Sequence, residues 1–235
     1  MATPLTAKLL SLIVHDLRNP LNAVNLSLQV IDQEVPPGCP ELQDDLGMLK
    51  ENVTQLERML RHLADYARLI EEPLTLRPLP FDPRRLLTDM VAEQSSRVPG
   101  GTASQLGLEL RPGCPTEVEL DQSRSHMAIH HLIANAVASA EGAPVRIVAG
   151  GGAGRLVVEA AVDRPPHPST EPVALRPDQF ERLMGTPAAR VGLELGIVAH
   201  ISELFGGTAR LAVNRGQGTS VILEWPVRAT ASGGE

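Results

Sequence analysis

The chain has 235 residues, a formal net charge of −7 and only 2% aromatic residues. This length is enough for two small domains that each bury a core. An acidic chain poor in aromatic side chains lacks both the phosphate-neutralising surface and the stacking platforms that nucleic-acid binding needs, so the composition excludes nucleic acid as a partner.

No segment of the sequence predicts insertion into a membrane. The longest apolar run near the N-terminus, Leu9 to Val14, is far too short to span a bilayer, and no secretory signal pattern is present. The two cysteines, Cys39 and Cys114, each lie in a Pro-Gly-Cys-Pro turn and are expected to be free thiols. We therefore expect a soluble cytoplasmic protein.

The first predicted element is a long helix from about Leu5 to Glu34. Its apolar residues recur with alternating spacings of four and three, which is typical of a helix that packs along one seam. The seam consists of Leu10, Val14, Leu17, Leu21, Val24, Leu28 and Ile31. His15 lies one residue past this seam, so its imidazole is expected at the edge of a helical bundle. Pro20 removes a backbone donor and should bend the helix just after His15.

A second helix is predicted from Glu41 to about Glu71, after a turn rich in proline at positions 35–40. Its seam is equally regular and consists of Leu42, Leu46, Leu49, Val53, Leu56, Leu60, Leu63, Ala67 and Ile70. Two helices joined by a short loop pack as an antiparallel hairpin. One hairpin alone leaves apolar surface exposed, so the pattern predicts a homodimer in which two hairpins form a four-helix bundle.

The second half of the chain predicts a domain of mixed helices and strands. Helices are expected at 84–95, 122–140 and 192–205. Strands are expected at 106–110, 145–149, 155–162, 208–213 and 219–225, with one more short strand that ends near residue 120. The glycine run 150–154 joins two strands and predicts a hairpin turn rather than a phosphate loop. The proline-rich segment 164–191 is expected to lack regular structure. The predicted domains are 1–72 and 81–228, with a linker at 73–80 and a disordered tail at 229–235.

Residues His15 to Leu21 read His-Asp-Leu-Arg-Asn-Pro-Leu. This string resembles the phospho-acceptor box of bacterial two-component sensor histidine kinases. The resemblance implies that His15 accepts a phosphoryl group, that Asp16 accepts the Nδ1 proton of its imidazole, and that Asn19 orients water for dephosphorylation. It also implies that the partner is a response-regulator receiver domain. The plainer alternative is a solvated histidine on an amphipathic helix.

Two stretches in the second half carry a further resemblance. The string His-His-Leu-Ile-Ala-Asn-Ala at 130–136, and the glycine-containing strings that begin at Gly192 and Gly216, are similar to the ATP-binding domain of the same kinases. The resemblance implies an α/β sandwich of the GHKL (Bergerat) type that binds ATP and Mg²⁺. It implies that Asn135 holds Mg²⁺ and that Asp163 binds the adenine amino group. The other implied nucleotide-binding residues are Gly192, Leu195, Gly218 and Thr219.

The sequence departs from the kinase pattern within this implied ATP site. His131 replaces the first asparagine of the 130–136 motif, and Glu194 replaces the middle glycine of the motif that begins at Gly192. Pro165 and His167 stand where the kinases have the two glycines that follow the adenine-binding aspartate, and proline lacks the conformational freedom of glycine. These changes predict a degenerate nucleotide site.

The sequence leaves two main functions open. One is a protein-histidine kinase that phosphorylates His15 from ATP, and the other is a pseudokinase or histidine phosphotransferase of a phosphorelay that no longer uses ATP. A purely structural coiled-coil scaffold leaves Asp16 and Asn19 unexplained, and a serine kinase or ATPase of the superfamily would lack the histidine helix. Since only fourteen residues precede His15, we expect the input signal to come from a separate sensor subunit.

Overall fold

The computed structural model describes most of the chain. The described residues are 4–34, 40–71, 75–97, 106–152, 154–163, 173–176, 189–214 and 218–228. The chain divides into two compact units, Met1–Pro73 and Leu74–Glu235. The predicted turn at 35–39, the linker residues 73–74 and the tail at 229–235 lie outside the described residues, and the finer domain boundaries stay predictions.

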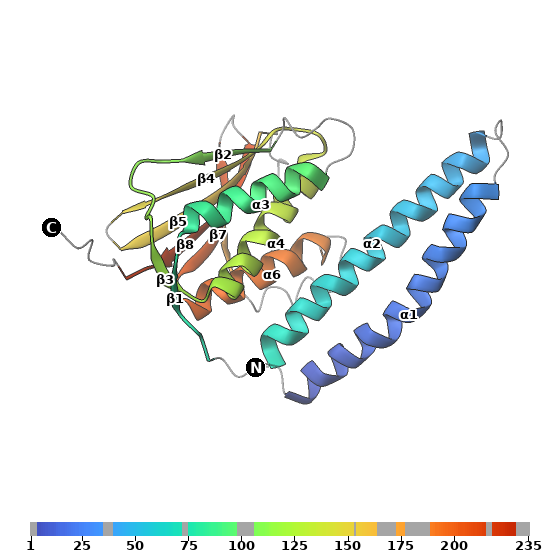
Figure 1. The fold of residues 1–235 in the computed structure, drawn as a ribbon, viewed down its shortest axis with the longest axis horizontal. Helices are drawn as coiled ribbons and strands as arrows, with labels where there is room; N and C mark the ends of the chain where they lie inside the picture. Colours follow the sequence, from blue (N-terminus) through green and yellow to red (C-terminus); the bar gives the residue numbers. More distant parts are fainter. Residues whose placement is uncertain are drawn as a thin grey trace. The chain divides into compact units, whose positions relative to one another are not determined.

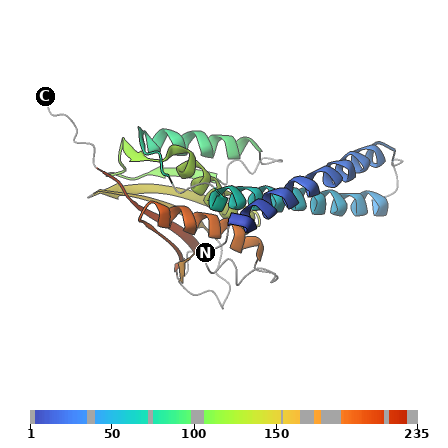
Figure 2. The ribbon, with the colours of Figure 1, turned by 90° about the horizontal axis from the view of Figure 1, so that it is seen from below.

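The first unit is a helical hairpin. Helix α1 (Pro4–Glu34) and helix α2 (Pro40–Glu71) pack against each other and lie side by side in both views (Figures 1 and 2). Pro20 lies inside α1 without ending it. The helical hairpin that the two seams predict is confirmed.

The heptad seam of each helix is divided between the hairpin interior and solvent. Every second seam position points inward: Leu28, Leu46 and Val53 form one buried cluster, with Leu21 partly buried against it. Six of the alternate positions are between 44% and 50% exposed, and they are Leu17, Val24 and Ile31 on α1 and Leu42, Leu49 and Leu56 on α2. The hairpin therefore leaves an apolar stripe of its heptads exposed on each helix.

Two polar contacts join the helices beside this core. The side-chain amide of Asn25 donates to Glu57 Oε1 at 2.8 Å, and Lys50 Nζ lies 2.6 Å from Asp32 Oδ1. Both contacts connect α1 to α2, so they favour one axial register of the hairpin in addition to the apolar packing.

The second unit contains a mixed six-stranded sheet with the order β2-β4-β5-β8-β7-β6 and a separate β1–β3 ribbon. The strands of the sheet are β2 (Leu106–Leu110), β4 (Val145–Gly152), β5 (Arg155–Val162), β6 (Val173–Leu175), β7 (Thr208–Asn214) and β8 (Gly218–Pro226). The ribbon strands are β1 (Leu79–Phe81) and β3 (Val118–Leu120), and the helices are α3 (Pro83–Arg97), α4 (Gln122–Ala140) and α6 (Ala189–Leu204). Strands β2 and β4 run parallel and all other neighbours are antiparallel. The predicted α/β domain is confirmed.

Trp225 identifies the face of the sheet that carries the helices. Its indole Nε1 donates to Ser202 Oγ of α6 at 2.9 Å, and its ring packs edge-on against Phe205. In the antiparallel register Trp225 lies opposite Leu156, so Leu156 and every second residue after it on β5 face the same side. Those residues are Leu156, Val158, Ala160 and Val162, each at most 5% exposed. Arg155, by contrast, pairs with Glu224 on the outer face.

Several details of this unit differ from the sequence-based expectations. Segment 164–191 was expected to lack regular structure, but it contains the edge strand β6, which pairs with β7, and the first turn of α6. The prolines around β6 hid a strand of only three residues. Strand β1 was not predicted, because Pro80 suggested a linker, although proline is tolerated in a two-stranded ribbon. The rest of 164–191 lies outside the described residues.

Strand β4 also runs further than expected, to Gly152, because its glycines continue the pairing with β5 up to Gly152 opposite Arg155. A Cβ on Gly151 would lie 2.2 Å from the carbonyl oxygen of Arg155, so this close approach requires glycine. The expected hairpin between the two strands is present.

None of the helices described is both long and apolar enough to cross a membrane. The thiol of Cys114 is free and buried, whereas Cys39 lies outside the described residues. A cytoplasmic location stays a prediction.

The Trp225–Ser202 hydrogen bond supplies a stability test of the second unit. Replacing Trp225 with Phe removes the donor, leaves the Ser202 hydroxyl in a fully buried position, and opens a small void. We expect the free energy of unfolding to fall by about 1–3 kcal/mol in urea denaturation. In a Ser202→Ala background the same change should cost less, and equal costs in the two backgrounds would contradict the hydrogen bond.

Candidate functional site

The exposed side chain of His15 is the chemically distinctive feature of the hairpin. Its side chain is 73% exposed, and that of the neighbouring Asp16 is 69% exposed. His15 Nδ1 lies 3.2 Å from Asp16 Oδ1. With the proton on Nδ1, the imidazole donates to this carboxylate, and the lone pair of Nε2 faces solvent as a nucleophile.

The packing of α1 explains why His15 points outward. The preceding residue, Val14, is buried at 3% exposure, so the next side chain is turned away from the hairpin interior by one helical step. Asn19 is also exposed, and it lies four residues after His15, where helical side chains share a face. The structure thus places His15, Asp16 and Asn19 together on the exposed surface of α1.

The residues implied for nucleotide and metal binding are spread over α4, α6 and the end of the sheet. Helix α4 begins at Gln122 and is preceded by its N-cap Asp121, whose carboxylate accepts the backbone N–H of Arg124 at 3.1 Å. One stripe of α4, with members three or four residues apart, is buried, and α4 packs against α6. The members of this stripe are Arg124, Ala128, His131 and Asn135. Asn135, the implied Mg²⁺ ligand, is 5% exposed.

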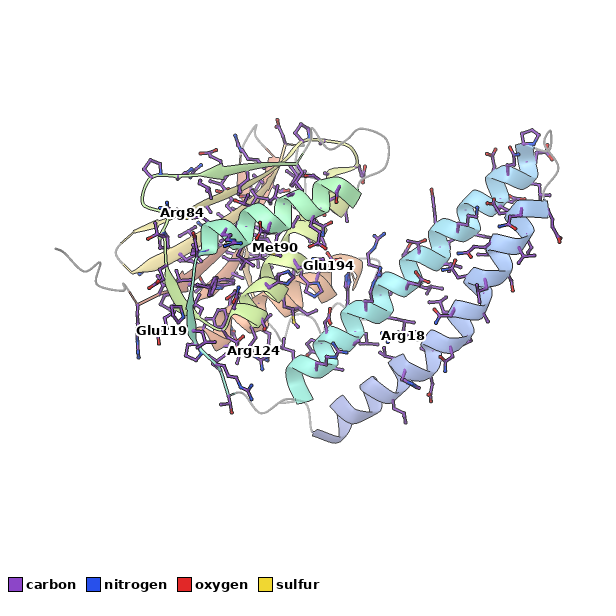
Figure 3. All side chains as sticks on the ribbon, viewed as in Figure 1. Arg18, Arg84, Met90, Glu119, Arg124 and Glu194 are labelled. Carbon is purple, nitrogen blue, oxygen red and sulfur yellow. The ribbon has the colours of Figure 1, made fainter. Side chains whose placement is uncertain are left out.

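Helix α6 carries Gly192, Glu194 and Leu195. Gly192 lies in the first turn of the helix, since α6 begins at Ala189. Glu194 is only 4% exposed and Leu195 7%. Glu194 lies four residues before Val198, which is fully buried, so its carboxylate is on the inward face of α6. Figure 3 labels Glu194 near the N-terminal end of α6 and Arg124 near that of α4.

The remaining implied residues lie where β5 ends and β8 begins. Gly218 opens β8 with a positive φ of 96°, a conformation that favours glycine. Thr219 lies opposite Val162 in the register, so its side chain faces the helix layer. Asp163 N–H donates to the carbonyl oxygen of Pro144 at 3.0 Å, which continues the pairing of β4 with β5 by one residue.

This continued pairing decides which way Asp163 faces. Val162 faces the helices, and side chains alternate along a paired strand, so Asp163 faces the outer side of the sheet. There it lines a cavity of about 330 Å³ together with Pro144, Arg146 and Ala161. The structure therefore places Asn135, Leu195 and Thr219 at the helix layer and Asp163 on the opposite face. The alternation of Val158, Ala160 and Val162 was visible in the sequence and could have revealed this difference.

His200 of α6 is a half-buried titratable group that the sequence motifs did not single out. Burial lowers its pKa from the ordinary value of 6.5; the nearby charge of Arg124 lowers the pKa further, and Glu203 partly opposes the change. The neutral imidazole is thus favoured at the contact between α4 and α6.

Comparison with known proteins identifies the hairpin. Residues 4–72 match the model of the His Kinase A (phospho-acceptor) domain. The hairpin is therefore similar to the phospho-acceptor domain of histidine kinases. The family resemblance that the sequence indicated is thereby confirmed, and the matched segment contains the exposed His15.

Two curated histidine kinases illustrate the relationship. Histidine protein kinase DivJ of Caulobacter vibrioides is 26% identical over 238 residues, which cover 94% of this chain and 37% of DivJ. Sensor histidine kinase RcsC of Salmonella typhimurium is 25% identical over 131 residues, covering 54% of this chain and 13% of RcsC. The chain therefore spans well under half the length of these relatives.

Solved structures of histidine kinases share the fold. Full-length ShkA in complex with AMPPNP has a TM-score of 0.66 and 23% identity, covering 98% of this chain and 47% of ShkA. ThkA in complex with the response regulator TrrA has a TM-score of 0.60 and 17% identity, covering 94% and 61%. AdeS of Acinetobacter baumannii has a TM-score of 0.58 and 20% identity, covering 91% and 98%. A helical hairpin followed by an α/β domain is thus the histidine kinase architecture.

The lowered pKa of His200 predicts a pH-dependent stability. In the unfolded chain this histidine takes up a proton near its ordinary pKa of 6.5, whereas in the folded chain its pKa is lower. The contribution of neutral His200 to the free energy of unfolding is therefore complete above about pH 6.5 and is lost as the pH falls toward the folded pKa. We expect His200→Gln to flatten the decrease in melting temperature between about pH 6.5 and pH 5. An unchanged slope in His200→Gln would contradict the assignment.

Proposed function

We propose that this protein is a histidine phosphotransfer component of a two-component system, in which His15 exchanges a phosphoryl group with an aspartate of a response-regulator receiver domain. The observation that carries the proposal is the geometry of His15. Its imidazole is exposed at 73%, and Asp16 accepts from Nδ1 at 3.2 Å, so Nε2 is the nitrogen available for transfer. The match of residues 4–72 to the His Kinase A (phospho-acceptor) domain supports this assignment.

Asp16 acts on the imidazole through the Nδ1 proton. Holding the proton on Nδ1 fixes the tautomer in which Nε2 carries the lone pair, and the carboxylate stabilises the positive charge that develops as the N–P bond forms. Because both side chains are largely exposed, solvent screens this contribution. The protein contributes chiefly the position of the nucleophile.

Asn19 is proposed to act in the reverse direction. Its amide lies one helical turn after His15 on the exposed face of α1. In this position it can orient a water molecule toward the aspartyl phosphate of a docked receiver, and so favour dephosphorylation of the receiver. This role leaves phosphorylation of His15 itself unaffected.

The proposed partner is a receiver domain. The fold neighbour ThkA was solved in complex with a response regulator, and its likeness to this chain supports the proposal. A receiver would approach the exposed face of α1 that carries His15, where Leu12 and Leu26 are also exposed at 58% and 63%.

We further propose that two copies of the hairpin pair through their exposed seam positions. The stripes formed by Leu17, Val24 and Ile31 on α1 and by Leu42, Leu49 and Leu56 on α2 repeat every seven residues. Apolar stripes of this kind are buried when a second hairpin completes a four-helix bundle. The proposed functional unit is therefore a homodimer.

Chemical loading tests the role of His15 without assuming any natural donor. Incubation with radiolabelled phosphoramidate, a small-molecule phosphoryl donor for imidazoles, should load the protein, and the loaded protein should pass its label to a receiver domain from the same genome. We expect His15→Ala to lose the transfer and Asp16→Asn to slow it by about tenfold or more. His126→Ala is the matched control and should transfer normally. Transfer from the His15→Ala protein would contradict the proposal.

The proposed dimer is tested by two matched substitutions on α1. Val24 and Leu26 are 47% and 63% exposed, but only Val24 belongs to the seven-residue stripe. We expect Val24→Glu to produce a monomer in analytical ultracentrifugation, because it places a charge in the paired interface. Leu26→Glu should remain a dimer. Identical masses for the two variants would argue against pairing through this stripe.

A further inference from the structure

We infer that the α/β domain does not form an ATP site and that the phosphoryl group on His15 comes from the aspartyl phosphate of a receiver domain. This inference rests on the proposed phosphotransfer function of His15 and specifies its phosphoryl donor. Three observations argue that the residues implied for nucleotide binding do not fit ATP and Mg²⁺.

The first observation is the direction of Asp163. The resemblance implies that one nucleotide contacts Asp163 together with Asn135 and Thr219, and the latter two lie at the helix layer. The bond from Asp163 N–H to the carbonyl oxygen of Pro144 keeps Asp163 in the β4–β5 pairing, one residue after the inward-facing Val162. Alternation along the strand then directs its carboxylate to the outer face, where it lines a cavity with Arg146. The carboxylate implied to bind adenine thus lies on the opposite face of the sheet from Asn135 and Thr219.

The second observation is the buried carboxylate of Glu194. Glu194 is 4% exposed on the inward face of α6, near the helix start where the resemblance implies the phosphates. A helix N-terminus favours anions through its free amides and dipole, and a buried glutamate there opposes a triphosphate by like-charge repulsion. On α4, His131 replaces an asparagine and is 1% exposed beside Asn135. Both substitutions therefore occupy the layer that ATP would need.

The third observation comes from the sequence after β5. Positions 164–167 read Arg-Pro-Pro-His, where active kinases have two glycines that let the backbone approach the nucleotide. Proline has a fixed φ and no amide donor, so it supplies neither the turn nor a hydrogen bond to phosphate. The changes on α4, α6 and the β5 end all weaken the same implied site.

Phosphoryl transfer from a receiver aspartate to His15 balances without ATP. The lone pair of His15 Nε2 attacks phosphorus of the receiver aspartyl phosphate, the N–P bond forms, and the P–O bond to the aspartate breaks. The aspartate carboxylate leaves with the bonding electron pair. The proton on His15 Nδ1 stays in place against Asp16, so no further acid, base or co-reactant is needed. The same step run backward returns the phosphoryl group to a receiver.

Nucleotide binding by the full chain tests the first half of the inference. We expect no change in melting temperature with about 1 mM ATP and Mg²⁺, and a dissociation constant above about 1 mM in calorimetry. A cooperative melting transition in the same samples shows that the protein is folded. Binding tighter than about 0.1 mM, or acid-labile labelling of His15 from [γ-³²P]ATP, would overturn the inference.

Receiver domains loaded with [³²P]acetyl phosphate test the second half. Label should move from at least one receiver of the host genome to the wild-type protein, and His15→Ala should stay unlabelled. Glu194→Gly is the matched control and should accept label from the receiver like wild type, because Glu194 plays no part in this step. If ATP labels His15, the inference fails and the phosphotransfer function stands. If neither ATP nor any receiver labels His15, and chemically loaded protein transfers to no receiver, the phosphotransfer function fails as well.

Discussion

A seven-residue apolar repeat on two helices cannot be fully buried by those two helices alone. In this hairpin, Leu28, Leu46 and Val53 close the interior, while Val24 and Leu49 remain in solvent. Burial of apolar surface is the main favourable term in helix packing. The exposed stripe therefore favours packing against a second hairpin. The face of α1 that belongs to neither the buried nor the exposed stripe then stays open to solvent. His15 lies on that remaining face, next to the buried Val14.

The α/β domain keeps its fold through contacts that do not depend on a nucleotide. Trp225 holds β8 against α6 through Ser202 and Phe205, and Asp121 caps α4. The substitutions in the implied nucleotide site, such as Glu194, leave these contacts intact. The core of the domain can therefore persist whether or not a nucleotide is bound.

The regular elements were predictable because their signals are local. The heptad seams gave both long helices to within one residue at each described end, and the 122–140 helix and the 106–110 strand agree with the structure. Strand β6 was missed because three residues beside prolines carry little periodic signal, and its pairing with β7 is a long-range contact.

The candidate site was predictable to different degrees in its two parts. The exposure of His15 followed from its position one residue past the seam, whereas the division of the seam into inner and outer halves required the packed hairpin. For Asp163, motif matching placed the residue at the end of a strand but did not consider which face of the sheet its side chain points to. The alternation of apolar residues in the sequence indicates an outward direction for this side chain, and the fold adds the bond to Pro144 that keeps Asp163 in the strand pairing.

The account depends most on the nitrogen of His15 that carries phosphate. Because Asp16 accepts from Nδ1 at 3.2 Å, phosphorylated protein should contain Nε2-phosphohistidine at residue 15, detectable by ³¹P NMR combined with ¹⁵N-labelled histidine. The account predicts one such signal, absent from His15→Ala protein. A phosphoryl group on Nδ1 of His15, or only on another residue, would contradict it.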